Sequence, residues 1–195
     1  SSSSVYGDRN EVPFRETDPV DQPVSPYAAT KKAGEVICHA FHHLHDINIF
    51  CLRYFTVYGP RQRPEMAIHR FTSMIQQGQA IPMFGDGSME RDFTYIDDIV
   101  TGTISALDRV SGFEILNLGN HRSIRLDGLI ELIGKSCGLP VEIDRLPAPA
   151  GDVSRTCASI DKANQLLGYS PQTPIEDGVE KFVSWFNAQQ QKNKC

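Results

Sequence analysis

The stretch Ser25-Pro26-Tyr27-Ala28-Ala29-Thr30-Lys31-Lys32 places a tyrosine four residues before a lysine, directly behind a proline. Proline suits the first turn of a helix, and Ser25 can accept a hydrogen bond from the free N–H groups there. Because residues four apart share one face of a helix, Tyr27 and Lys31 should point the same way. A nearby ammonium group lowers the pKa of a phenol, which is ordinarily about 10. The pattern therefore predicts a tyrosine that can take a proton from an alcohol near neutral pH.

Three further motifs surround this stretch. Ser1-Ser2-Ser3-Ser4-Val5-Tyr6-Gly7 lies upstream. Downstream lie Leu52-Arg53-Tyr54-Phe55-Thr56-Val57-Tyr58-Gly59-Pro60-Arg61 and Arg91-Asp92-Phe93-Thr94-Tyr95-Ile96-Asp97-Asp98. A tyrosine above a lysine is by itself an ordinary pair on a helix surface. In this order and spacing, however, the four motifs resemble the extended short-chain dehydrogenase/reductases. The set looks most like the NAD-dependent epimerase/dehydratase family, and above all its UDP-glucuronate 4-epimerases, from Ser1 to about Phe186.

The resemblance implies an α/β fold, namely the C-terminal part of a Rossmann-type doubly wound parallel sheet with a smaller α/β substrate-binding lobe. Residues 1–65, with later segments that return to them, are expected in the NAD-binding domain. Residues 66–188 are expected mainly in the nucleotide-sugar lobe, and 189–195 in a frayed tail. The sequence lacks the G-x-G-x-x-G turn with which the family binds the pyrophosphate of NAD. We therefore expect a C-terminal fragment of a longer enzyme, with a natural short paralogue as the alternative.

Hydrophobic periodicity and turn residues predict the remaining elements. Helices are expected over 27–44, 66–77, 97–107, 126–137, 160–167 and 175–188, and strands over 47–55, 113–118 and 141–146. The first helix carries an apolar stripe made of Ala33, Val36, Ile37, Ala40, Phe41 and Leu44. Asp97 and Asp98 are expected to cap their helix rather than to act as catalysts.

The resemblance assigns the catalytic groups. Tyr27 would be the base, and Lys31 would lower the pKa of a tyrosine beside it and hold the nicotinamide ribose. A serine before Val-Tyr-Gly would align the sugar hydroxyl, and counting back from that motif selects Ser2. Ser4 remains a second candidate, because alternate residues of a strand face the same way. Family members that dehydrate or decarboxylate their sugar carry acidic residues where Ser3 and Ser4 stand, which leaves epimerisation.

The strand over 47–55 should deliver the sugar-binding groups to the carboxyl edge of the sheet. The resemblance implies that Tyr54 contacts the nicotinamide and that Thr56 contacts the sugar. Two arginines follow in Arg61-Gln62-Arg63, and arginine can grip a carboxylate with two hydrogen bonds. We expect Arg63, together with Thr56, to bind a sugar carboxylate. The alternative is a pair of arginines exposed to solvent.

The same resemblance assigns the UDP contacts to three later residues. Phe84 would lie near the uracil, although a hydrophobic strand residue is an equal alternative. Arg91 would bind the diphosphate, where its charge and donor geometry fit. Asp152 would lie near the ribose.

Composition and charge exclude several classes of function. The net charge is −5 with no lysine- and arginine-rich block, so a nucleic-acid partner is not expected. No apolar run is long enough for a membrane span. The five cysteines are widely spaced, which indicates reduced thiols of a cytoplasmic protein. Four histidines crowd the first helix, but no carboxylate or cysteine pattern completes a metal site, so no metal is expected.

The predicted function is NAD-dependent epimerisation at C4 of a UDP-sugar, from UDP-glucuronate to UDP-galacturonate, through a 4-keto intermediate. The family resemblance also implies a homodimer built on the first helix. The first alternative is a UDP-glucose 4-epimerase or another nucleotide-sugar epimerase. The second is a non-catalytic fragment that only binds a UDP-sugar.

Overall fold

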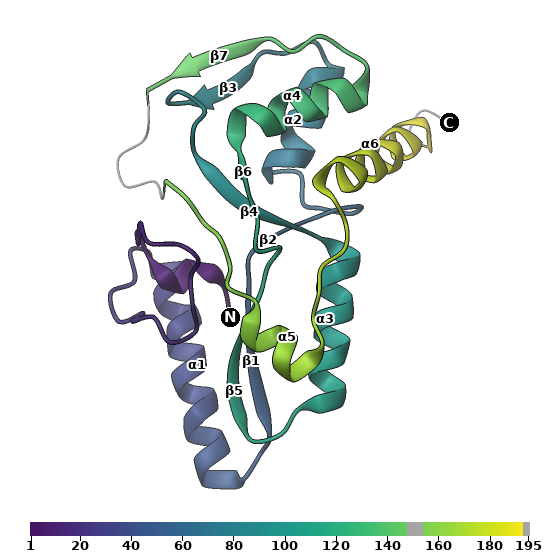
Figure 1. The fold of residues 1–195 in the computed structure, drawn as a ribbon. Coiled ribbons are helices and arrows are strands. Elements are labelled where there is room, and N and C mark those ends of the chain that lie inside the picture. Colours follow the sequence, from purple (N-terminus) through teal and green to yellow (C-terminus); the bar gives the residue numbers. More distant parts are fainter. Residues whose placement is uncertain (148–153, 193–195) are drawn as a thin grey trace.

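The computed structural model describes residues 1–147 and 154–192, and it forms an elongated α/β molecule (Figure 1). One end holds α1 (Pro26–His45), α3 (Ile96–Arg109) and α5 (Asp161–Leu167) around β1 (Ile49–Tyr54) and β5 (Phe113–Leu118). In Figure 1, α1 lies on one side of the β1–β5 pair, and α3 and α5 lie on the other. This arrangement of helices on both sides of parallel strands is the Rossmann-type architecture that the sequence predicted.

The two strands β1 and β5 are parallel and fully in register. Their pairing runs from Ile49 opposite Phe113 to Tyr54 opposite Leu118. Their apolar side chains pack under α3 and α5, where Leu116 and Leu118 are completely buried. Such near-continuous apolar strands are typical of a parallel sheet covered on both faces.

The other end of the molecule contains the remaining strands and helices. Its strands are β2 (Thr56–Tyr58), β3 (Ile81–Phe84), β4 (Glu90–Tyr95), β6 (Ser123–Arg125) and β7 (Ile143–Leu146). Its helices are α2 (Ala67–Gln76), α4 (Leu126–Cys137) and α6 (Ile175–Lys192). β2 is parallel and β6 antiparallel to β4, while β3 pairs with β7 in parallel. Side chains from α2, α4 and α6 pack together in the largest apolar core.

Three local expectations were wrong. Ser2 and Ser4 do not alternate along a strand, because only Ser2 pairs, with Tyr54, before a 3-10 helix η1 (Ser3–Tyr6) begins. Asp97 and Asp98 do not cap α3; they lie in its first turn, and Asp98 instead accepts backbone hydrogen bonds from Gln172 and Thr173. The expected tail is not frayed at its start, because α6 continues to Lys192.

Helix α1 differs from an ordinary amphipathic helix, because its apolar face is exposed and a charged residue is buried. Its buried residues are Ala28 and the charged Glu35. The whole predicted apolar stripe is exposed, and Leu44 at its end is 71% exposed. An exposed apolar helix face of this kind marks a surface that another structure covers.

The structure also bears on membrane association. Among the described residues, no helix has the length and apolar character needed to cross a bilayer.

Candidate active site

Tyr27 and Lys31 lie together at the start of α1. Ser25 accepts a hydrogen bond from Ala28 N at 3.1 Å and Pro26 occupies the first helical turn, as the sequence predicted. Lys31 Nζ stands 5.4 Å from the centroid of the Tyr27 ring. Tyr27 is 55% exposed, and within the described ranges neither its hydroxyl nor Lys31 Nζ has a hydrogen-bond or ion-pair partner. Both groups are therefore free to meet a ligand.

The two candidate serines lie beside the first strand of the sheet. Ser2 forms a parallel bridge with Tyr54, which places it at the carboxyl end of β1. Its Oγ is 3.2 Å from Ser4 Oγ and accepts a hydrogen bond from Ser4 N at the same distance. The two hydroxyls are neighbours because Ser2 caps η1, and not because they alternate along a strand. Ser2 is the more buried of the two.

Tyr54 turns its side chain away from α1. Its hydroxyl lies 3.0 Å from Thr103 Oγ1 on α3, and its ring packs with the apolar side chains on that side of the sheet. The part of Tyr54 next to Ser2 is therefore its backbone. A contact from Tyr54 to a ligand beside Ser2 would come from the main chain.

The residue before Tyr54 forms a buried ion pair that the sequence analysis missed. Arg53 donates from Nε to Glu35 Oε1 at 2.8 Å and from Nη2 to Glu35 Oε2 at 2.9 Å. Ser1 Oγ also donates to Glu35 Oε1, at 2.6 Å. Burial alone would raise the pKa of Glu35, but the hydrogen bonds from Arg53 and Ser1 hold that pKa below its ordinary value. The one available signal was Glu35 itself, four residues beyond Lys31 on the same helix face.

The loop after β2 presents its two arginines to solvent and turns its glutamine inward. Gln62 donates to Val57 O at 3.0 Å and accepts from His69 N at 3.2 Å, which ties the loop to β2 and α2. Arg63 is 75% exposed and pairs with Glu65 at 3.2 Å. Arg63 thus lies at the surface beside a neighbouring carboxylate.

The predicted UDP contacts lie on β3 and β4. Phe84 is 38% exposed at the end of β3, so its ring is partly available for stacking. Arg91 lies half-buried on β4, and its Nη1 donates to the carbonyl of Glu90 at 2.9 Å. Asp152 lies outside the described residues.

Next to Arg91, Asp92 is completely buried and serves as an acceptor for the surrounding backbone. Its carboxylate accepts from Asn120 N at 2.7 Å, from Ala158 N at 3.0 Å and from Thr94 Oγ1 at 3.1 Å. Burial raises the pKa of Asp92 to about 6, although these donors oppose the rise. The side chain therefore joins β4 to two later segments and is not available to a ligand.

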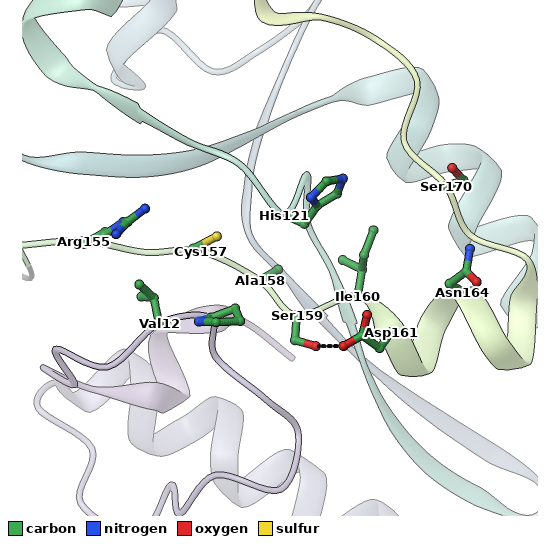
Figure 2. Close-up of a pocket in the computed structure, with 11 residues that line it drawn as sticks. Val12, His121, Arg155, Cys157, Ala158, Ser159, Ile160, Asp161, Asn164 and Ser170 are labelled. Atoms are coloured by element: carbon green, nitrogen blue, oxygen red, sulfur yellow. Dashed lines mark hydrogen bonds between the residues drawn. The ribbon is translucent and has the colours of Figure 1, made fainter.

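An open hollow of 770 Å³ lies elsewhere (Figure 2). It is bordered by the 12–13 loop, His121 and the segment from Arg155 to Asp161. Figure 2 shows the hydrogen bond between two of its lining residues, Ser159 and Asp161, which is 3.0 Å long. None of the predicted catalytic or substrate residues that the structure describes lines this hollow. The candidate site is therefore defined by Tyr27, Lys31 and Ser2.

The histidines of α1 are engaged in packing. The rings of His39 and His42 lie 4.9 and 6.0 Å from that of Phe113, and His42 Nδ1 is 2.7 Å from Ile47 O. Among the residues that the structure describes, no group of three or more His, Cys, Asp or Glu could hold a metal ion.

A parallel α/β sheet with a Tyr-x-x-x-Lys helix and a serine at its carboxyl edge defines a short-chain dehydrogenase/reductase-like class of protein. A family model described as "NAD dependent epimerase/dehydratase family" matches residues 1–119. The chain belongs to the NAD dependent epimerase/dehydratase family.

Three relatives show where the chain stands in this family. It is 44% identical to UDP-glucuronate 4-epimerase of Thermodesulfobacterium geofontis, covering 95% of this chain and 57% of the relative. It superposes with a TM-score of 0.89 on UDP-glucuronic acid 4-epimerase from Bacillus cereus in complex with UDP-glucuronic acid and NAD, at 39% identity, covering 97% and 60%. For UDP-glucose 4-epimerase of Thermotoga maritima the TM-score is 0.91, at 30% identity, covering 97% and 62%. The chain spans about six-tenths of the length of these relatives.

Proposed function

We propose that the protein epimerises a UDP-sugar at C4, with Tyr27 as the base. The observation that carries this proposal is the Tyr27–Lys31 pair, in which Tyr27 is exposed, Lys31 is half-buried with its Nζ 5.4 Å from the phenol ring, and neither group has a hydrogen-bond partner within the described ranges. The phenol oxygen of Tyr27 would accept the proton of the sugar 4-hydroxyl as a general base, with the ammonium of Lys31 beside it on the same helix face. Ser2, at the neighbouring strand end, would hydrogen-bond the same hydroxyl and set its direction.

The residues present fit one end of NAD. The free ammonium of Lys31 can donate to the hydroxyls of the nicotinamide ribose, and the Tyr54 backbone beside Ser2 lies at the carboxyl edge where open α/β sheets bind dinucleotides. When bound, NAD would accept the hydride of C4 and return it, which is chemistry that no side chain supplies. The chain has no G-x-G-x-x-G turn, so its own residues fit the nicotinamide end and not the pyrophosphate.

The UDP part of the substrate would be held by Phe84, Arg91 and Asp152. Phe84 is exposed enough to stack on a base, and the guanidinium group of Arg91 suits a diphosphate. Anchoring at UDP leaves the sugar free to turn over within the site, so that its two faces are presented in succession.

UDP-glucuronate is the proposed substrate, because Arg63 can take its carboxylate. The Arg63–Glu65 pair is exposed, and such pairs contribute only about 0–1 kcal/mol, so a ligand carboxylate can replace Glu65 at little cost. The 4-keto form of a uronate is a β-keto acid, which loses CO2 when its carboxylate bond aligns with the carbonyl π system. By holding the carboxylate, Arg63 and Thr56 would prevent that alignment.

UDP-glucose is the second candidate, and the Arg63–Glu65 contact is the observation that favours it. An arginine already neutralised by its neighbour need not select an acidic sugar. The resemblance to the Thermotoga maritima structure, named for UDP-glucose, supports this candidate as well.

The exposed apolar stripe of α1 supports a homodimer formed by this helix. The four described cysteines are free thiols, which supports a reducing compartment such as the cytoplasm. A non-catalytic UDP-sugar-binding role would not account for the Tyr27–Lys31 pair, whose polar groups have no hydrogen-bond partners within the described ranges.

An assay with mixed substrates tests the proposal. The whole protein is incubated with equal amounts of UDP-glucuronate and UDP-glucose, and the anomeric protons are followed by NMR. Conversion of UDP-glucuronate alone to UDP-galacturonate is expected. Conversion of UDP-glucose alone would overturn the role of Arg63 but not that of Tyr27, and no conversion of either would overturn the epimerase function itself.

A further inference from the structure

A buried carboxylate joins the helix of the candidate site to the sheet. Glu35 lies on α1, a helix whose exposed face is apolar, and its side chain is 2% exposed. It binds Arg53 of β1 through both oxygens, at 2.8 and 2.9 Å, and the Ser1 hydroxyl at 2.6 Å. Lys32 Nζ stands 3.7 Å away on the outer side. Glu35 is therefore fixed from the helix, the strand and the N-terminal segment at once.

Arg53 also forms hydrogen bonds with buried residues beyond Glu35. It is 1% exposed, and its Nη1 donates to the Tyr6 hydroxyl at 2.9 Å. That hydroxyl donates to Asn117 Oδ1 at 2.7 Å, and the Asn117 amide donates to the carbonyls of Phe14 and Ser159. Every polar group of this network thus has a partner, which is the condition for a buried network to be rigid.

Both residues of the ion pair lie close in the chain to residues of the candidate site. Tyr27, Lys31 and Glu35 are spaced four apart on one face of α1, so Glu35 lies about 12 Å along the helix from Tyr27. Arg53 precedes Tyr54, and the residue that Tyr54 pairs with is Ser2. The contacts of Glu35 therefore relate the segment with Tyr27 to the segments with Ser2 and Tyr54.

The energetics of such a pair favour an aligning role over a stabilising one. Removing two charges from water costs about as much as their attraction returns, and apolar residues of similar size often give equal stability. The planar fork of arginine, however, accepts a carboxylate in one geometry, so it fixes both the rotation and the height of α1 on β1.

We propose that Glu35 and Arg53 are positioning residues, which hold the Tyr27 hydroxyl in reach of the Ser2 hydroxyl and of the sugar. This inference rests on the proposed function. Misplacing a catalytic group by about 1 Å can lower a rate about 100-fold, so a small shift of α1 is sufficient to slow the reaction.

The test replaces both charges together in the whole protein, with Glu35→Leu and Arg53→Met. A single replacement would leave a buried unpaired charge and destabilise the protein, whereas the double replacement leaves none. The control is Glu114→Leu with Lys162→Met, which makes the same kind of replacement in a half-exposed ion pair of 2.6 Å between β5 and α5. Arg53→Lys is a second variant, which keeps the charge but loses the fork.

The readout is the single-turnover rate constant, normalised to bound NAD, together with the affinity for the UDP-sugar. In the Glu35/Arg53 variant the rate constant should fall about 10- to 100-fold while the affinity changes less than about threefold. The rate constant of the control variant should equal that of the wild type. The rate constant of Arg53→Lys should be lower than that of the wild type, as in the double variant.

Two results would overturn the positioning role. The first is a rate constant within about threefold of the wild type in the double variant or, where that variant does not fold, in Arg53→Lys. The second is a decrease only in the amount of bound NAD or in the affinity for the UDP-sugar, with an unchanged rate constant, which would indicate that the ion pair serves the structure alone. If the wild type turns over no UDP-sugar, the proposed function itself has failed, and that result is distinct from both.

Discussion

At the scale of single residues, the proposed reaction depends first on the phenol of Tyr27. Tyr27→Phe removes the proton acceptor but keeps the ring beside Lys31, so UDP-sugar binding should be unchanged. The value of kcat should fall about 10²- to 10⁴-fold, which is the usual contribution of a general base. Steady-state kinetics with titration calorimetry measures both quantities, and a kcat close to that of the wild type would exclude Tyr27 as the base.

Arg63 and Arg61 form a natural pair of test and control. Arg63→Met should raise the KM for UDP-glucuronate about tenfold, corresponding to about 1.4 kcal/mol, and should release some UDP-pentose as the unprotected β-keto acid loses CO2. Arg61→Met, at the exposed neighbouring position, should leave both unchanged. Analysis of the products by NMR tests this role of Arg63. If Arg63→Met turns over UDP-glucuronate as the wild type does and releases no UDP-pentose, this arginine does not hold the carboxylate.

Asp92 should make stability depend on pH. Its pKa is about 6 in the folded protein, against about 4 in an unfolded chain, so the folded state binds the proton more tightly between these values. Its contribution to the free energy of unfolding is therefore full below about pH 4 and is lost as the pH rises through about 6.

The variant Asp92→Asn, which does not titrate, provides the reference for this effect. Between pH 4 and pH 6 the wild type should lose about 3 kcal/mol relative to the variant, and above about pH 7 the difference should be constant. Urea unfolding at a series of pH values measures the difference. A pH-independent difference would mean that Asp92 ionises as an exposed carboxyl does.

At the scale of elements, α1 is the helix with the clearest expectation for assembly. A lysine in its exposed apolar stripe, as in Phe41→Lys, should weaken a dimer formed by this face because it places a charge in an apolar contact. Leu107→Lys makes the same change on the exposed face of α3 and serves as the control. Sedimentation velocity of the whole protein should show monomer for the first variant only; a monomeric wild type, or a dimer insensitive to Phe41→Lys, would contradict the assignment.

Most elements could be predicted from the sequence because their signals are local. The Ser25 cap, the apolar runs of β1 and β5 and the glycine after α2 each act within a few residues, and the structure confirms the helices and strands they predict. The start of the chain could not be predicted in this way. A run of four serines fits a strand end and a 3-10 turn equally well, and in the structure only Ser2 pairs with Tyr54 before the 3-10 helix begins at Ser3.

The candidate site was predictable where one helix sets the geometry and not where distant segments meet. The spacing of Tyr27 and Lys31 fixed their relation, and the structure confirms it. Glu35 and Arg53 are 18 residues apart and lie on different elements, so no spacing rule relates them. The direction of Tyr54 also depended on tertiary packing, because the neighbouring Arg53 takes the side of the sheet that faces α1.

At the scale of the whole molecule, the end with α1, α3 and α5 meets the end with α2, α4 and α6 at the carboxyl ends of β1 and β5. β1 passes directly into β2, which pairs with β4, so the backbone that carries Tyr54 continues into the strands with the proposed substrate groups. The Asp92 carboxylate and the Asn117 amide add hydrogen bonds across the same junction. A ligand that contacts both Tyr27 and Arg91 would therefore lie across this junction.

The central claim is that the hydrogen at C4 leaves the sugar and returns to it as hydride. The most direct test incubates the whole protein with UDP-glucuronate deuterated at C4, in ordinary water, and examines the galacturonate product by NMR and mass spectrometry. The product should keep its deuterium at C4, because the hydride never exchanges with solvent while Tyr27 handles only the hydroxyl proton. Replacement of the C4 deuterium by hydrogen from water, or epimerisation at another carbon, would rule out this return of hydride.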